Sequence, residues 1–290
     1  MNNKVIYFYR YSDLKIMSLG PVPDFLAKKN HHPRDDHISF EEGPHIYTVL
    51  GERGTYTSVT TWNHTHFEKF DKELALQKVL NNPKRFNNPT YKYYKMTEEE
   101  IREMWSSNDA AEAGTRMHYN IECYYNYMDV EHDGSPEFNY FMKFEKDHEN
   151  ELTPYRTEWM IYHEDLKLSG SIDMVFQNKK GELEIYDWKR SKSIEYDFDK
   201  PLYAKYAITP CISSLPDKNF WHYSLQLNVY KYILETKYGK KITKMCLVCL
   251  HPDNASKTYE LHQVDDLKKE IADLMELRAQ QVEEEKSKTI

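Results

Sequence analysis

The sequence contains no long apolar run. No stretch of its 290 residues approaches the roughly 18 to 20 consecutive apolar residues that a membrane-spanning helix needs. The first residues, MNNKVIYFYRYSDLKIM, also lack the apolar segment and small-residue cleavage site of a signal peptide. We therefore expect an intracellular protein with no membrane partner.

Cysteine is scarce, with four residues scattered along the chain, too few for a disulfide framework. Cys246 and Cys249 have the CxxC spacing of many metal sites. Both lie in the apolar stretch KMCLVCLHP, which favours packing in a buried strand over ligation of an iron–sulfur cluster.

An excess of basic residues is also missing: 39 Lys and Arg face 47 Asp and Glu, giving a net charge of −8. This excludes a protein that coats nucleic acid through its overall field, but not one with a local basic groove. The 24 tyrosines are numerous, and exposed ones can stack on unpaired bases, although most tyrosines in a globular protein pack in its core or on its surface.

Glycine is infrequent and no low-complexity linker divides the chain. We expect residues 1–95 to form an N-terminal extension, with a hairpin and a helix, packed on a core of residues 96–290. The extension begins with an irregular or partly strand-forming segment, 1–36. An insertion at about 195–222, which contains three prolines, interrupts the core.

Hydrophobic periodicity predicts the order of elements. HISFEEGPHIYTVL and GTYTSVTTW alternate around Gly51 and Gly54, which indicates a hairpin. Thr97 followed by three glutamates is a helix start with a capping side chain. The order is α/β, with helices at about 67–80, 97–105, 108–127, 136–149, 223–239 and 265–286, an antiparallel meander of strands at 156–165, 166–178 and 181–191, and another strand at 241–252.

Two carboxylates occupy adjoining strands of the meander. Asp173 lies in GSIDMVF and Asp187 in EIYDWKRS, and a short turn between their strands lets them share a metal ion. Asp187 and Lys189 share one strand face, and burying this pair on an apolar strand is costly without a function. The lysine can orient or deprotonate a water, or stabilise charge on a phosphate. Trp188 should point to the other face, toward a packed layer.

His118 and Glu122 share a helix face at i, i+4 spacing. An imidazole beside two carboxylates suits Mg²⁺ or Mn²⁺, so we expect His118 within reach of both aspartates. Gly114 would let this helix lie close to another backbone. Gln226 and Tyr230 also share a helix face, and they can contact a phosphate or hold the lysine in place.

Together, the motifs GxxxH, GSxD, DWK and QxxxY resemble the RecB-like branch of the PD-(D/E)XK nuclease superfamily. The stretch from EWMIYHED to DWKRSK is most similar to mitochondrial genome maintenance exonuclease-type proteins and their large-DNA-virus relatives. The resemblance covers about residues 110–250, with Ile172-Asp173 in place of the name-giving Pro-Asp. It implies an α/β fold with a restriction-endonuclease-like core, in which a central mixed sheet is flanked by helices.

The resemblance also implies roles for individual residues. His118, Asp173, Asp187 and the backbone carbonyl of Trp188 would bind Mg²⁺ or Mn²⁺, with Lys189 as the catalytic lysine. Gln226 and Tyr230 match the accessory motif. The implied activity is a DNA exonuclease acting at single-stranded ends in replication, repair or recombination.

Two alternatives stay open. One is a duplex-resecting or RNA-cleaving nuclease with the same metal centre, and the other is a non-catalytic nucleic-acid-binding module. The intact acids and lysine argue against the second.

Several further residues have two interpretations each. Glu122 acts as a base or binds a metal-bound water, or it is a solvated carboxylate. Glu158 is better explained as an exposed strand end than as part of a site. Ser58 and Thr60 bind a phosphate or simply favour a strand, and Arg190 and Lys192 contact a nucleic-acid backbone or are solvated cations. His31 and His32 are better explained by a solvated loop than by a metal site.

Overall fold

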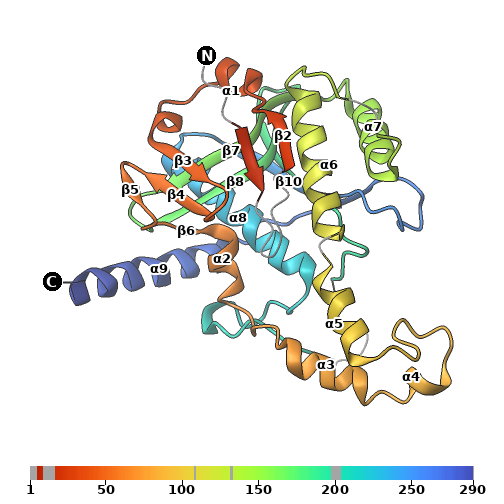
Figure 1. The fold of residues 1–290 in the computed structure, drawn as a ribbon. Coiled ribbons are helices and arrows are strands. Elements are labelled where there is room, and N and C mark those ends of the chain that lie inside the picture. Colours follow the sequence, from red (N-terminus) through yellow and green to blue (C-terminus); the bar gives the residue numbers. More distant parts are fainter. Residues whose placement is uncertain (1–4, 9–16, 108, 131–132, 197–203, 290) are drawn as a thin grey trace.

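The centre of the fold is a six-stranded mixed sheet with strand order β11-β10-β9-β8-β6, in which β7 also pairs with β8 (Figure 1). The structure is a computed structural model that describes residues 5–8, 17–107, 109–130, 133–196 and 204–289. Helices flank the sheet, so the expected restriction-endonuclease-like α/β architecture is confirmed.

The expected meander is present. Strands β7 (Leu152–His163), β8 (Leu168–Asn178) and β9 (Leu183–Lys189) pair antiparallel in chain order. Strand β9, most of β8 and the second half of β7 are largely buried, because helices cover both faces of the sheet. Helix α8 (Asn219–Lys237) then leads to β10 (Ile242–Cys249), which lies parallel to β9. A short edge strand, β11 (Glu260–Gln263), was not expected from the sequence.

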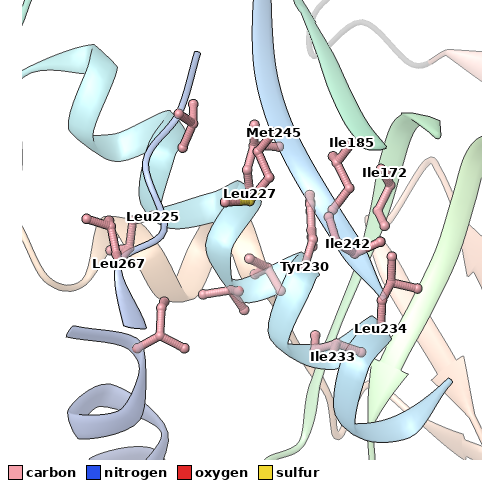
Figure 2. Packing of buried hydrophobic residues seen from close by; sticks show 14 of the residues in the cluster. Ile172, Ile185, Leu225, Leu227, Tyr230, Ile233, Leu234, Ile242, Met245 and Leu267 are labelled. Carbon is pink, nitrogen blue, oxygen red and sulfur yellow. The ribbon is translucent and has the colours of Figure 1, made fainter. Parts of the chain in front are cut away.

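Each face of the sheet has its own apolar cluster. Helices α8 and α9 (Lys268–Thr289) cover one face, where Tyr230 and Leu227 pack against Ile172 and Ile185 (Figure 2). Helices α6 (Asp109–Tyr125) and α7 (Pro136–His148) cover the other face. Trp188 is 2% exposed in that second cluster, so its expected orientation toward a packed layer is confirmed.

The expected hairpin around Gly51 and Gly54 was partly wrong. Its first arm is itself a hairpin of β3 (Ile38–Glu41) and β4 (Ile46–Val49), extended by β5 (Glu52–Arg53).

In the second arm only β6 (Thr57–Ser58) is a strand, paired parallel to β8, and α2 (Val59–His64) follows it. The hydroxyl of Ser58 accepts the backbone N–H of Thr61 and caps this helix, which then buries Val59 and Trp62 on one side.

Residues 68–107 form a helical lobe beside the main body (Figure 1). It contains α3 (Lys72–Leu80), α4 (Lys84–Asn87) and α5 (Glu98–Ser106). The start of α5 is confirmed, with a capping box between Thr97 and Glu100. Within the lobe only Leu76 and Ile101 are buried, so it has almost no core of its own.

The remaining elements refine the expected boundaries. Helix α8 begins four residues before 223, and α9 begins three residues after 265. Asn108, the expected start of α6, and residues 197–203 of the expected insertion lie outside the described residues. Among described residues, no helix is both long and apolar enough to span a membrane. The N-terminal elements are β1 (Val5–Phe8), β2 (Met17–Pro21), α1 (Phe25–Lys29) and a 3-10 turn at Pro33–His37, and another such turn lies at Pro210–Ile212.

Candidate metal centre and active site

His118 on α6, Glu158 on β7 and Asp173 on β8 converge at one point. Each offers a ligand atom, and these atoms all lie within 4.8 Å of one another. Nδ1 of His118 is 3.5 Å from Oδ2 of Asp173 and 3.9 Å from Oε1 of Glu158. Across the described parts of the chain, this is the one cluster of three such side chains with metal-binding spacing.

Glu158 corrects the expectation of an exposed strand end. Strand β7 begins at Leu152, so Glu158 is well inside it, with its side chain 37% exposed. The pairs Thr157–Met174 and Trp159–Ile172 place it opposite Asp173. The sequence held this signal, because counting back from the tight turn at 164–167 pairs residue 158 with 173.

Both strands change face at these two acids. Ile172 packs on the side of α8, whereas Met174 packs under α6 and α7, although alternation would put them on one face. Across from them, Glu158 has a left-handed φ of +41°, rare for a residue inside a strand. This switch turns both carboxylates toward His118.

Asp187 and Lys189 form a buried ion pair beside this group. Nζ of Lys189 lies 2.6 Å from Oδ2 of Asp187, whose side chain is 2% exposed. The same ammonium lies 4.4 Å from the ring centre of Tyr223. Asp187 is therefore engaged by Lys189 and lies outside the three-residue group, whereas His118 does reach Asp173 as expected.

The two aspartates are linked through the backbone. Pairing of β8 with β9 ends at Met174 and Tyr186, so these two strands are not paired with each other at Asp173 and Asp187. The backbone N–H of Trp188 donates a 3.0 Å hydrogen bond to Oδ2 of Asp173 instead. This contact fixes one carboxylate oxygen and leaves the other free to bind.

The titration of these groups reflects their crowding. Burial lowers the pKa of His118, but Asp173 and Glu158 outweigh it and raise that pKa to about 9. Burial raises the pKa of Asp187 to about 6, against the opposing effect of Lys189. Burial opposes the charge on Lys189, yet Asp187 and Asp173 raise its pKa to about 12. Without a metal ion, a protonated imidazole therefore balances the carboxylates.

Two further carboxylates face the group. Burial and the charge of Glu158 raise the pKa of Glu122 to about 8, and this residue is partly buried on α6. Burial and Glu158 also raise the pKa of Glu42, in the turn between β3 and β4. Sequence reasoning missed Glu42, because only the fold brings that turn to the centre.

Gln226 and Tyr230, the residues of the accessory motif, lie on α8 where it packs against β8. Nε2 of Gln226 donates a 3.0 Å hydrogen bond to the hydroxyl of Tyr230, which is buried against Gly170. Tyr223, one turn before Gln226 on α8, contacts Lys189. No sequence motif indicated this contact.

The remaining candidates have protein partners or stay at the surface. Nε of Arg190 is 2.7 Å from Glu137, and the exposed Lys192 is 3.3 Å from Asp253. Thr60 is exposed on α2, next to the capping Ser58.

The structure also gives the surroundings of three other groups of residues singled out from the sequence: the two neighbouring histidines, the two CxxC cysteines and Gly114. His31 pairs with Asp36, and His32 caps the 3-10 turn that follows it. Cys246 and Cys249 are fully buried in β10, which confirms their packing role. At Gly114 helix α6 lies near Arg190, which follows β9, but a Cβ at residue 114 would meet Cβ of Arg190 at an ordinary 4.0 Å, so the approach does not require glycine.

The donor set fits a divalent metal ion. Carboxylate oxygens and one imidazole nitrogen are ligands that Mg²⁺ and Mn²⁺ accept. Glu158 and Asp173 lie opposite each other across a strand pair, where like charges repel unless a cation lies between them. Metal binding here requires His118 to lose its proton.

Comparison with known proteins gives the family. The sequence profile of the PD-(D/E)XK nuclease superfamily matches residues 64–289, which is most of the chain and includes every residue of the centre except Glu42. No curated protein matches the chain. The chain belongs to the PD-(D/E)XK nuclease superfamily and is a metal-dependent nuclease.

Proposed function

We propose that the protein is a metal-dependent deoxyribonuclease that acts as an exonuclease at single-stranded DNA ends in replication, repair or recombination. It would belong to the RecB-like branch, with mitochondrial genome maintenance exonuclease-type and viral relatives. The branch is supported by its four motifs, and the end preference follows from that resemblance.

One observation carries the proposal. The three-residue group of His118, Glu158 and Asp173 adjoins a buried Lys189–Asp187 pair. A structural role alone does not account for it, because burying several charges on a central sheet is costly. A divalent cation bound here could stabilise charge on a scissile phosphate and activate a water, and a fixed positive group beside it could stabilise further negative charge.

The proposed ligands are His118, Asp173, Asp187 and the Trp188 carbonyl, with Glu158 added. Bound Mg²⁺ or Mn²⁺ would stabilise charge on the scissile phosphate and lower the pKa of a water. In the metal-free protein Asp187 and Asp173 raise the pKa of Lys189 to about 12, so its ammonium is charged. Beside a bound phosphate, Lys189 would orient the attacking water or stabilise charge on the phosphate.

Other residues serve the substrate in this proposal. Tyr223 limits the freedom of the Lys189 ammonium, and Gln226 and Tyr230 support the strand beneath it. The proposed contacts to the nucleic-acid backbone are Arg190, Lys192, Ser58 and Thr60. Of the two cations, Lys192 has the more exposed side chain. Glu122 would hold a metal-bound water.

The test is digestion of end-labelled single-stranded, duplex and circular DNA, and of RNA, with Mg²⁺, Mn²⁺ or EDTA. Lys189→Ala is the inactive variant. Lys180→Ala, in the exposed turn between β8 and β9, is the matched control that removes a lysine elsewhere. We expect metal-dependent shortening of linear single strands, intact circles and at least a 100-fold loss in Lys189→Ala alone.

Each other result selects an alternative. Cleaved circles would show an endonuclease, and preferential digestion of duplex ends or of RNA would identify a different substrate. Binding without cleavage of any substrate would leave a non-catalytic module.

A further inference from the structure

The helical lobe contains a segment with an unusual composition. Residues 81–96, NNPKRFNNPTYKYYKM, hold four cations and four aromatic rings but no Asp or Glu. This is notable in a chain with a net charge of −8. We call residues 81–96 the basic aromatic segment.

The segment has a defined shape. The guanidinium of Arg85 donates to the carbonyl of Met96 at 2.6 and 2.8 Å, and the backbone N–H of Lys95 donates to the carbonyl of Arg85 at 2.8 Å. Nε1 of Trp105, on α5, donates to the hydroxyl of Tyr93 at 3.0 Å. Arg85 is therefore structural, and the two ends of the segment are tied together.

The other three cations are available to a ligand. Lys84, Lys92 and Lys95 are exposed, and no carboxylate among the described residues pairs with them. Elsewhere on the surface, many lysines do have a carboxylate partner, such as Lys143 with Asp147. Three unpaired ammonium groups on one short segment form a local positive site for phosphates.

Aromatic rings lie among these cations, and the ring of Phe86 is exposed while the three tyrosines are partly buried. Phe86 is 66% exposed, a large apolar surface with no polar atom to hydrate. Its ring lies 4.9 Å from the guanidinium carbon of Arg85, and the Lys95 ammonium lies 5.1 Å from the ring of Tyr94. Rings alternating with cations suit a chain that has both bases and phosphates, because single-stranded nucleic acid offers a stacking face at every nucleotide.

The lobe leads into the helix that carries His118. The basic aromatic segment precedes α5, and the chain passes from α5 toward α6 (Figure 1). Helix α5 has nine residues, or about 13 Å along its axis, and His118 is nine residues beyond Asp109 of α6, or about another 13 Å. Two consecutive helical stretches thus separate the segment from the metal centre, a path that an extended single strand of several nucleotides can follow.

We propose that the basic aromatic segment binds the single-stranded DNA that the metal centre cuts. Lys84, Lys92 and Lys95 contact phosphates, and Phe86 stacks on a base. This inference rests on the proposed function for its substrate, and the segment acts by holding the strand while the metal centre performs the chemistry.

The test measures binding separately from cleavage. The full-length protein in EDTA is titrated against a fluorescein-labelled single-stranded oligonucleotide, and anisotropy gives Kd over a range of salt concentrations. The variants are Lys84→Ser/Lys92→Ser/Lys95→Ser and Phe86→Ala. The matched control is Lys179→Ser/Lys180→Ser/Lys268→Ser, which removes the same charge from other exposed positions.

We expect the slope of log Kd against log salt to fall by about 2 in the segment triple variant, since each phosphate contact on a single strand contributes about 0.7. Phe86→Ala should weaken binding by about tenfold or more through lost stacking. The control triple should bind like the unmodified protein. Duplex DNA should show a smaller loss, because its bases are already paired and stacked.

Three results would overturn the inference: unchanged binding in both segment variants, equal losses in the control triple, or a larger loss for duplex or RNA. So would a concentration-dependent dimer abolished by Phe86→Ala with DNA binding intact, which would make this surface a contact between copies. Because binding is measured without metal, a protein that binds through the segment but never cleaves would refute the proposed function alone.

Discussion

Gly170 of β8 lies against the ring of Tyr230 of α8, and a Cβ at residue 170 would stand 2.7 Å from Cε1 of that ring. We expect Gly170→Ala to lower the free energy of unfolding by about 1–3 kcal/mol, because a buried ring has little room to move. Urea denaturation measures this. Gly114→Ala is the control, because its added Cβ would meet only an atom 4.0 Å away. This substitution should stabilise helix α6 by about 0.5–1 kcal/mol, since alanine favours a helix more than glycine does. Equal stability of the two variants would contradict the packing argument.

Glu158→Gln should weaken metal binding. It removes a proposed ligand, so we expect at least about a tenfold loss of Mn²⁺ affinity by calorimetry. In the metal-free protein it removes both the repulsion from Asp173 and the attraction to the His118 imidazolium, which act in opposite directions on stability. Glu151→Gln, at an exposed carboxylate before the same strand, should not change Mn²⁺ affinity. Full Mn²⁺ affinity in Glu158→Gln would remove Glu158 from the ligand set.

Lys189→Met should be destabilising, and more so as pH rises. It leaves Asp187 buried without its cation, which costs about 3–5 kcal/mol when the carboxylate is charged. Burial already raises the pKa of Asp187 to about 6, above its unfolded value, so the folded carboxyl takes up a proton first as pH falls. The deficit should therefore be large at pH 8 and small at pH 5.

The partner substitution tests the same pair. Asp187→Asn in the Lys189→Met background should restore much of the stability at pH 8, because no charge is left unpaired. A deficit that is independent of pH would show that lost packing, and not the unpaired carboxylate, causes the destabilisation.

Two buried histidines should make the fold sensitive to acid. Burial lowers the pKa of His66 and of His163 to about 4, below an unfolded value near 6.5. Their contribution is complete above about pH 6.5 and is lost as pH falls toward 4, because the unfolded chain binds the protons. We expect each to contribute about 1–3 kcal/mol to this loss. Urea titrations at pH 7.5, 6 and 5 measure it.

His66→Gln should flatten that dependence, whereas His37→Gln, at an exposed position, should not. An unchanged slope in His66→Gln would show that this imidazole is protonated equally in both states.

Elements specified by local signals were predictable from the sequence. The meander of β7, β8 and β9 follows from apolar runs between tight turns, and the start of α5 from its capping box. Asp173, Asp187 and Lys189 stood out because acids and a lysine on apolar strands have few structural explanations.

Features that depend on tertiary contacts were not predictable. Ser58 begins a helix because α2 buries Val59 and Trp62 against the core, which overrides the strand preference of Thr60 and Thr61. Glu42 reaches the metal centre only through the fold of the N-terminal hairpin, and Tyr223 reaches Lys189 only through the packing of α8 against the sheet.

Helix α6 has 17 residues, with the helical lobe at its first end and His118 in its second half. A hydrogen-bonded helix of this length does not stretch, so the start of α6 and His118 keep a constant separation. If the basic aromatic segment holds a strand, α5 and α6 together separate that contact from the metal centre. A strand too short to reach from one to the other would lose the contact with the segment, and its digestion would slow at that length.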